Sequence, residues 1–350
     1  MPKPVRLGVL NDQTDNAPVH DPLTDWLHRE IADLQAAGRL PVEVELVHAY
    51  GMGLPWGSAQ ALERAYRELL DQDVALIIGP AIGDNALLAT PWVERDRVPT
   101  INWSGAERAR GEWMFHLQVG SHEDESLVMA RHLAAAGCKR AAVIYDLSPI
   151  GVQHLKYFED EARILALDIV HSAGIQPLAE DAADEVRTAL SHDPDGFVYL
   201  GLGPSAPAVA KALTASGWQG PRIMNTAGLR GYIESYARLI DGWIYIDMHS
   251  NANRTLQALL ERYGIAPQGA YGAAKAHDLA RLAIEGIARA QEYTREGIRT
   301  GLEQIKWLPA AEGEDGTLLG FGIQDRGALH GRYLVPRQWL DGRTVEVAKA

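Results

Sequence analysis

Apolar and polar residues follow two recurring patterns along the chain. Short, mainly apolar runs occupy positions 7–10, 74–78 and 196–200, as in strands that are buried on both faces. Between them lie longer stretches with apolar residues at three- and four-residue spacing, the pattern of amphipathic helices. Strict alternation of the two patterns predicts parallel sheets whose strands are joined by helices through right-handed crossovers.

The order of these patterns predicts two α/β sections followed by a helical one. The first section has predicted strands at 7–10, 42–47, 74–78 and 98–101, with helices from Leu23 to Gly38, at 60–70 and up to Arg95. The second has predicted strands at 141–145, 168–171, 196–200, 222–225 and 243–247, and helices at 121–136, 153–165, 184–190, 208–216 and 232–239. The third has helices at 255–263, 271–290 and 295–304, then strand-like pieces at 331–335 and 344–347. Because helices without strands need a sheet to cover, we expect the chain to leave its first domain, build a second and return.

Length and charge narrow the class of protein. A chain of 350 residues suits two domains better than one compact core. A formal net charge of −13 argues against a nucleic-acid partner and against docking on an anionic membrane. No apolar window is long enough for membrane insertion. The single cysteine, Cys138, excludes an internal disulfide and a cysteine zinc cluster.

The start of the sequence leaves two locations open. Met1-Pro-Lys-Pro leads directly into the first apolar run, with no secretory signal before it. The protein is periplasmic if a signal peptide was removed ahead of residue 1, and cytoplasmic if Met1 is the native start.

Known catalytic and cofactor motifs are missing or incomplete. Residues 201–206 have the glycine spacing of a dinucleotide-binding loop, but Pro204 removes a backbone donor, and no acidic residue for the ribose lies between Asp195 and Glu234. Cys138 is expected to be a structural thiol, because the sequence indicates no His or Asn partner. The sequence therefore predicts a binding protein and not an enzyme, with no catalytic residue, cofactor or metal site.

In doubly wound sheets, ligands bind beyond the carboxyl ends of the strands, and that rule selects particular loops. The candidate ligand-binding residues of the first section are Asp12, Gln13, Trp56, Gly83, Asp84, Asn85, Trp103, Ser104 and Gly105. Those that follow are Tyr145, Ile150, Gly203, Ala227 and His249.

Two of these positions have competing interpretations. The backbone amides around Gly83 precede a helix and could receive an anion or a carbonyl oxygen, although Asp84 could simply be the N-cap of that helix. Trp103 follows a strand and offers a flat apolar surface to a ligand, although a tryptophan of the lobe core would give the same pattern.

Several segments together resemble one family. They are Ile77-Ile-Gly79-Pro80, Val98-Pro99-Thr-Ile-x-x-Ser104-Gly-Ala106, Ala141-Ala-Val-Ile-Tyr145-Asp146 with Ile150-Gly151, Asp195-Gly-Phe-Val-Tyr-Leu-Gly201, and Asp325-Arg-Gly327-Ala-Leu-His-Gly331. In order and spacing the chain resembles the leucine/isoleucine/valine-binding family of type I periplasmic binding proteins. The resemblance implies an α/β fold of two doubly wound parallel-sheet lobes joined by a three-crossing hinge. The N-terminal lobe would be 1–119 and 249–321, and the C-terminal lobe 120–248 and 322–350, with crossings near Val119, Met248 and Phe321.

The sequence departs from the family where amino-acid-binding members contact their ligand. Gly83 stands in place of a serine, and Ile150 and Gly203 in place of tyrosines. The acidic partner of the ligand's α-ammonium group is replaced by Ala227. An amino acid would then leave a buried, unpaired charge, which is costly. The resemblance therefore predicts that leucine-type amino acids do not bind, and that the ligand is aromatic, an amide or a carboxylate.

The main prediction is a solute-binding protein that captures a small organic ligand by hinge closure and delivers it to the membrane subunits of an ABC importer. Two alternatives remain open at this stage. One is a cytosolic sensor of the same fold that acts on a regulator protein, and the other is an oxidoreductase or hydrolase on a two-lobed α/β fold.

Overall fold

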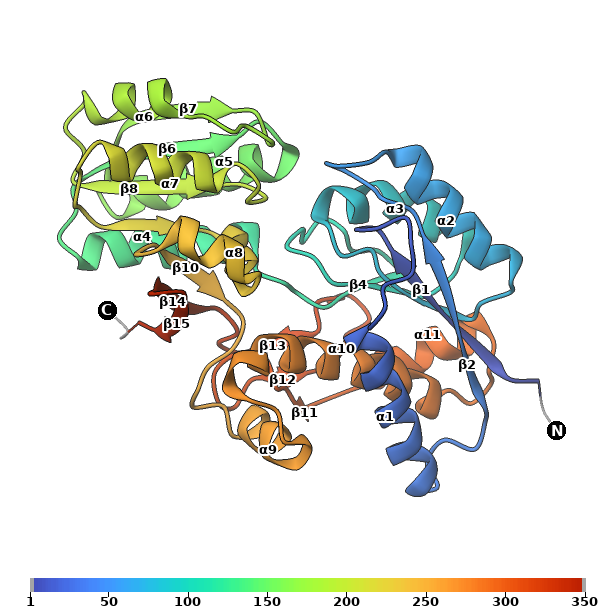
Figure 1. Ribbon diagram of the computed structural model, residues 1–350. Helices are drawn as coiled ribbons and strands as arrows, with labels where there is room; N and C mark the ends of the chain where they lie inside the picture. Colours follow the sequence, from blue (N-terminus) through green and yellow to red (C-terminus); the bar gives the residue numbers. More distant parts are fainter. Residues whose placement is uncertain (1–2, 348–350) are drawn as a thin grey trace. The chain divides into compact units, whose positions relative to one another are not determined.

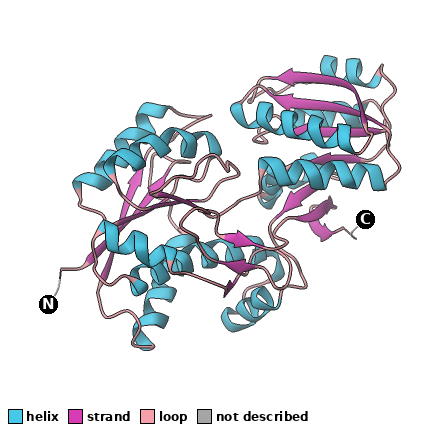
Figure 2. Cartoon of the chain, turned by 180° about the vertical axis from the view of Figure 1, so that it is seen from behind, coloured by secondary structure: helices cyan, strands magenta, loops and turns pink. Residues whose placement is uncertain are grey.

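The computed structural model describes residues 3–347 and divides the chain into two compact units (Figures 1 and 2). Unit 1 contains the chain up to Val119 together with His249–Tyr333. Unit 2 contains Gly120–Met248 and the chain from Leu334 onward. Met1, on which the predictions of a periplasmic or a cytoplasmic location were based, lies outside the described residues. Among residues 3–347, no helix is both long enough and apolar enough to cross a membrane.

Unit 1 is built on a parallel sheet with the strand order β2-β1-β3-β4-β5. The strands are β1 (Val5–Asn11), β2 (Val44–Tyr50), β3 (Leu76–Ile78), β4 (Thr100–Asn102) and β5 (Met114–His116). The helices are α1 (Pro22–Ala36), α2 (Ala59–Asp71), α3 (Gly83–Asp96), α9 (Arg254–Tyr263), α10 (Ala270–Arg289) and α11 (Arg295–Glu303). Helices α2 and α3 share one apolar core with the sheet, and α1 packs beside α10 on the other side of β1 (Figure 1).

A small antiparallel sheet completes unit 1. Its strands are β11 (Leu308–Pro309), β12 (Leu318–Leu319) and β13 (Leu329–His330). The segment before β13 also touches the large sheet, because Gly327 bridges to His116 at the end of β5. This bridge attaches the segment before β13 to the large sheet of unit 1.

Unit 2 has a sheet of order β15-β14-β10-β9-β8-β6-β7, with only β14 and β15 running antiparallel to their neighbours. The strands are β6 (Arg140–Asp146), β7 (Asp168–Ile175), β8 (Gly196–Leu200), β9 (Arg222–Met224), β10 (Ile244–Asp247), β14 (Val335–Leu340) and β15 (Arg343–Glu346). The helices are α4 (His122–Ala135), α5 (Pro149–Ile164), α6 (Ala183–Leu190), α7 (Ala206–Ala215) and α8 (Glu234–Ala237).

The period-2 alternation of the central strand β6 explains how this sheet is covered on both faces. Ala141 and Val143 belong to the apolar core under α4 and α5, while Ala142 and Ile144 belong to the core under α6 and α7. A strand buried on both faces reads as a continuous apolar run, which is how the sequence revealed it.

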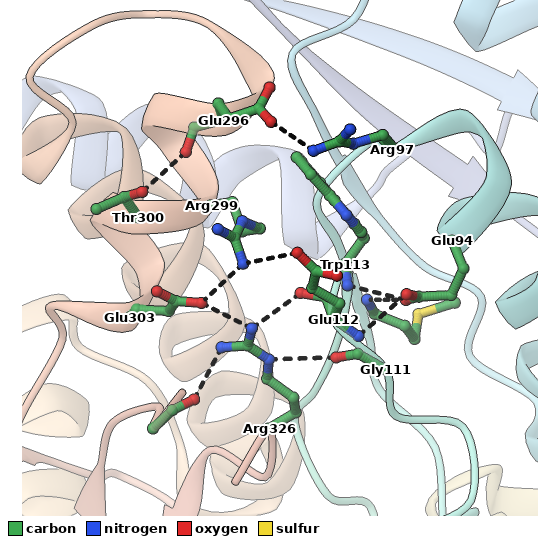
Figure 3. A network of polar contacts seen from close by, with 12 residues as sticks. Glu94, Arg97, Gly111, Glu112, Trp113, Glu296, Arg299, Thr300, Glu303 and Arg326 are labelled. Carbon is green, nitrogen blue, oxygen red and sulfur yellow. Dashed lines mark hydrogen bonds and ion pairs between the residues drawn. The ribbon is translucent and has the colours of Figure 1, made fainter. Parts of the chain in front are cut away.

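The third passage between the units differs from the sequence prediction. The chain leaves unit 1 after Tyr333 and not near Phe321. The buried guanidinium of Arg326 holds the intervening segment, donating to Gly111 O (3.2 Å), Glu112 O (2.9 Å) and Glu303 Oε1 (2.7 Å), all within unit 1 (Figure 3). The predicted strand at 331–335 is accordingly wrong, because this passage interrupts it between β13 and β14.

The predicted helix at 232–239 is also replaced by shorter pieces. A 3-10 helix spans Thr226–Tyr232, α8 covers one turn, and a second 3-10 turn spans Arg238–Ile240. Ile233 takes an extended conformation between the first two pieces, and this breaks the helical hydrogen-bond pattern. By contrast, the predicted helix at 121–136 is present as α4, and Ser121 caps it, since its Oγ accepts from Asp124 N (3.0 Å).

Candidate functional site

The loops that follow β1 and β3 in unit 1 are joined by a buried carboxylate. Asp12 follows β1 and accepts hydrogen bonds from Ala81 N (2.9 Å), Ile82 N (3.0 Å) and Asn85 Nδ2 (2.8 Å). Burial raises the pKa of Asp12 above its ordinary value, and these hydrogen bonds oppose the rise. Asp12 therefore caps the start of α3 from a distant strand.

The loop after β2 is attached to the same cluster through Asn85. The Asn85 side chain is fully buried, accepts from Leu54 N (2.9 Å) and donates to Leu54 O (3.2 Å). Trp56 lies farther along this loop and is 42% exposed. The polar atoms of Asp12 and Asn85 thus hold three strand-end loops in place.

The structure changes the interpretation of Gly83 and Asp84. Both are buried in the first turn of α3, and the N-cap residue is Ile82, without a capping side chain of its own. Asp84 is therefore not the N-cap, because the carboxylate that receives the Ile82 amide comes from Asp12. The sequence could not reveal this, since the two residues are far apart along the chain.

A pocket of about 270 Å³ opens beside Trp103 at the carboxyl end of β1. It is lined by Val9, Leu10, Asn11, Asp12, Gln13, Thr14, Asp21, Pro22, Leu23, Trp103, Gly272, Lys275, Ala276 and Leu279. Asp12, Gln13 and Trp103 are thus the sequence candidates that the structure brings together around one cavity.

Trp103 is half-buried and lies under a cation. The ammonium group of Lys275 is 4.6 Å from the centroid of the Trp103 ring and 4.4 Å from that of Tyr271. Lys275 Nζ also donates to Tyr271 Oη (2.9 Å). Sequence reasoning missed Lys275 and Tyr271, because the rule of strand-end loops does not reach into helix α10.

Ser104, next to Trp103, has a supporting role. Its buried hydroxyl donates to Asn102 Oδ1 (2.8 Å), and its carbonyl accepts from Val119 N (2.8 Å). Gly105 follows in the same loop, outside the residues that line the pocket. His249 is likewise buried in unit 1, where it bridges to Gly313.

In unit 2, the loops after β6 and β8 are joined by Asp146. This fully buried carboxylate accepts from Leu202 N (2.7 Å) and from the hydroxyl of Ser148. Tyr145 is half-buried beside it, and Ile150 is buried in the first turn of α5.

The loops after β8 and β9 are joined in turn by Asn225. Its Nδ2 donates to Gly201 O (2.9 Å) and to His154 Nε2 (3.1 Å), and its Oδ1 accepts from Gly201 N (3.3 Å) and Ala227 N (3.4 Å). Ala227 is buried, and its amide contributes to the loop's own hydrogen bonds.

Gly203 occupies a place that no larger side chain could take. Its φ of +108° lies in the region that favours glycine, and a Cβ atom there would approach Arg230 Cδ to 2.7 Å. Arg230 donates from Nε to Leu202 O (3.0 Å), and burial lowers the pKa of its guanidinium. Arg230, in the 3-10 helix that follows β9, is a second charged residue that sequence reasoning missed, after Lys275 in α10.

Comparison with known proteins agrees with this architecture. A family model described as "Periplasmic binding protein" matches residues 56–331. No curated protein gives a significant match.

Solved structures of similar fold cover nearly the whole chain. A leucine-binding protein, LivK, from Thermotoga maritima is 18% identical, with a TM-score of 0.80 and coverage of 98% of each chain. A type 1 periplasmic binding protein from Bordetella pertussis is 16% identical, with a TM-score of 0.80, over 99% of this chain and 100% of that one. An ABC transporter substrate-binding protein from Desulfitobacterium hafniense, in complex with Leu, is 16% identical, with a TM-score of 0.76 and the same coverage.

The family match spans most of the chain, and its members are substrate-binding proteins. The two parallel-sheet units with a returning chain are the fold of the type I members. The chain therefore belongs to the periplasmic binding protein family, and its fold is that of the type I members.

Proposed function

We propose that the protein is the periplasmic solute-binding component of an ABC importer and captures one small organic ligand by hinge closure. The observation that carries the proposal is the pocket at the carboxyl end of β1, where Trp103, Gln13 and Thr14 meet an apolar wall. Ligands of doubly wound folds bind at such strand ends. Family membership supports the delivery role.

In this proposal, two buried polar side chains of unit 1 hold the site in place. Asp12 and Asn85 fix the loops around the pocket, because their side-chain atoms are engaged by backbone amides and carbonyls. Trp103 supplies apolar contact area. Sites that are held by such hydrogen bonds need little reordering when a ligand arrives.

A thermal-shift screen tests the proposal. We expect at least one compound in a panel of aromatic acids, amides, polyols, nucleobases and amino acids to raise the melting temperature, because binding to the native state stabilises it by mass action. Leucine should give no shift, since Ala227 provides no acidic partner for its ammonium group. If no compound of any class raises the melting temperature, capture of a small organic solute is contradicted.

Replacing Trp103 with Ala should weaken binding of the compound found in that screen by about tenfold to a hundredfold, as loss of a buried aromatic contact does. Isothermal titration calorimetry measures the change. Trp307→Ala is the matched control, because Trp307 is 70% exposed and lies outside the pocket and the strand-end loops, and it should alter the affinity by less than about twofold. Equal affinities of Trp103→Ala and the parent protein would assign Trp103 to packing alone.

A further inference from the structure

Lys275 is the ionisable group of the pocket whose charge the described residues leave uncompensated. Its ammonium group lies over the rings of Trp103 and Tyr271 and donates to the Tyr271 hydroxyl. These contacts place the cation and hold its stem, but a phenol and two ring faces carry no negative charge. Within residues 3–347, no carboxylate forms an ion pair with Lys275.

The carboxylates of the two acidic residues of the pocket already accept hydrogen bonds from groups other than Lys275. Asp12 gives its oxygens to Ala81 N, Ile82 N and Asn85 Nδ2. Asp21 caps helix α1, accepting from Leu23 N (3.1 Å) and from Thr24 Oγ1 (2.7 Å). A ligand ammonium group would therefore compete with existing hydrogen bonds, whereas a ligand anion would meet a cation with donors to spare.

One part of the wall is polar, with Asn11, Asp12, Gln13, Thr14 and Asp21, and the other part is apolar. Val9, Leu10, Leu23, Ala276 and Leu279 line the cavity together with Trp103. A volume of about 270 Å³ lies just below the range of about 300–1,000 Å³ that is usual for small-molecule sites, which favours a compact ligand. A cavity with one cationic group, two carboxylates that already accept hydrogen bonds and an apolar side fits a compact molecule with one anionic end and an apolar body.

We propose that the ligand is a small organic carboxylate without an ammonium group, with its carboxylate bound by Lys275 and its apolar body against the wall beside Trp103. This inference rests on the solute-binding function proposed above and names the ligand class of the same site. It adds Lys275 as the residue that selects for negative charge, because charge-assisted hydrogen bonds in partly buried sites are the strong ones.

Probes that vary the charge and the apolar body of the ligand separately test the proposal. Benzoate, benzamide and phenylalanine share a phenyl ring and carry an anion, a neutral amide and a zwitterion, and cyclohexanecarboxylate and hexanoate vary the apolar body. Isothermal titration calorimetry should show tighter binding of at least one carboxylate than of its neutral amide, and no binding of phenylalanine.

The variant Lys275→Met removes the charge and keeps an unbranched apolar stem. It should weaken carboxylate binding by about tenfold to a hundredfold and change amide binding by less than about twofold. Lys275→Arg should retain the preference for the anion. Lys211→Met, an exposed lysine on α7 in unit 2, is the matched control and should leave all affinities unchanged. Equal melting temperatures of the ligand-free proteins show that each variant is folded.

The outcomes separate this inference from the proposed function. If an amide or an amino acid binds as tightly as its carboxylate, or if Lys275→Met keeps the anion preference, the carboxylate assignment is wrong while solute binding stands. If nothing in the carboxylate series or in the wider screen binds, the solute-binding function fails and the assignment fails with it.

Discussion

Replacing Arg326 with Met is expected to lower the free energy of unfolding of unit 1 by about 3–5 kcal/mol, the usual cost of breaking a buried ion pair from one side. The guanidinium is 4% exposed and donates to four oxygen atoms, three of them backbone carbonyls of Gly111, Glu112 and Gly322. Methionine satisfies none of them. Buried acceptors without a donor each lose the hydration that they had in the unfolded chain.

The fourth acceptor, Glu303, is less affected by the substitution than the three carbonyls. It also accepts a hydrogen bond from Arg299 Nη1 (3.2 Å), which should remain when Arg326 is replaced (Figure 3). Arg326→Lys should recover part of the stability, because lysine restores the charge but not the planar fork that reaches several acceptors at once.

Denaturant unfolding with hydrogen exchange in each unit measures this effect. Protection should fall in residues 111–116 and 322–330 and stay unchanged in unit 2. Arg163→Met is the matched control, since its ion pair with Asp160 is at the surface (3.0 Å, 74% and 51% exposed side chains), and such pairs contribute at most about 1 kcal/mol. A loss for Arg326→Met no larger than the control's would show that its hydrogen bonds are not needed for stability.

The sequence predicted the long apolar strands of the fold but missed most of the short ones. Apolar runs such as 141–145 and 196–200 predicted strands that the structure contains, because a strand buried on both faces needs apolar residues on both. Strands β5, β11, β12, β13 and β14 were missed. The first four are two or three residues long and owe their conformation to pairing with other segments, as between His116 and Gly327, while β14 has six residues and begins where the predicted piece at 331–335 ends.

In the candidate site too, local sequence patterns predicted the loops but not the contacts between residues that are distant in the sequence. The strand-end rule led to the right loops, and it selected Asp12, Gln13 and Trp103, which line one pocket. It could not distinguish residues that face the pocket from residues that hold it. Asp12 and Asn85 are 73 positions apart, and only the folded chain shows that they bond to each other.

Helix α10 supplied the residue that the rule omits altogether. Lys275 belongs to the strandless section of the sequence, where the pattern predicts a covering helix and nothing more. Its relation to Trp103 depends on how that helix lies beside α1, and no local signal in the sequence specifies this.

Lowering the pH from 6.5 to 4 is expected to remove about 3 kcal/mol of unit 2 stability through the buried His122, with a further loss through His154 beside it. His122 at the start of α4 and His154 in α5 are 2% and 1% exposed, and their ring centroids are 4.5 Å apart. Burial lowers the pKa of His122 from 6.5 to about 4, although a hydrogen bond with Gln153 opposes the change. Burial and the neighbouring His122 both lower the pKa of His154.

The sign follows from where protons bind. Both imidazoles are neutral when folded, and the unfolded chain binds their protons at a higher pH. The stability that they contribute is therefore complete above about pH 6.5 and is lost as the pH falls toward 4, at about 1.4 kcal/mol per unit of pKa difference. His154 Nε2 also accepts from Asn225, so its protonation would disturb the hydrogen bonds that hold the loops after β8 and β9.

Urea unfolding between pH 7 and pH 4 measures this dependence, and variants isolate it from the titration of carboxylates. His122→Phe keeps a ring against His154 but cannot bind a proton, so its stability should fall less steeply than that of the parent protein. His20→Gln, at a histidine with a 69% exposed side chain, should follow the parent curve. Because carboxylates such as Glu125 and Asp146 are common to all three proteins, their contribution cancels in the differences. Parallel curves for His122→Phe and the parent would mean that the buried imidazoles do not set the acid sensitivity of unit 2.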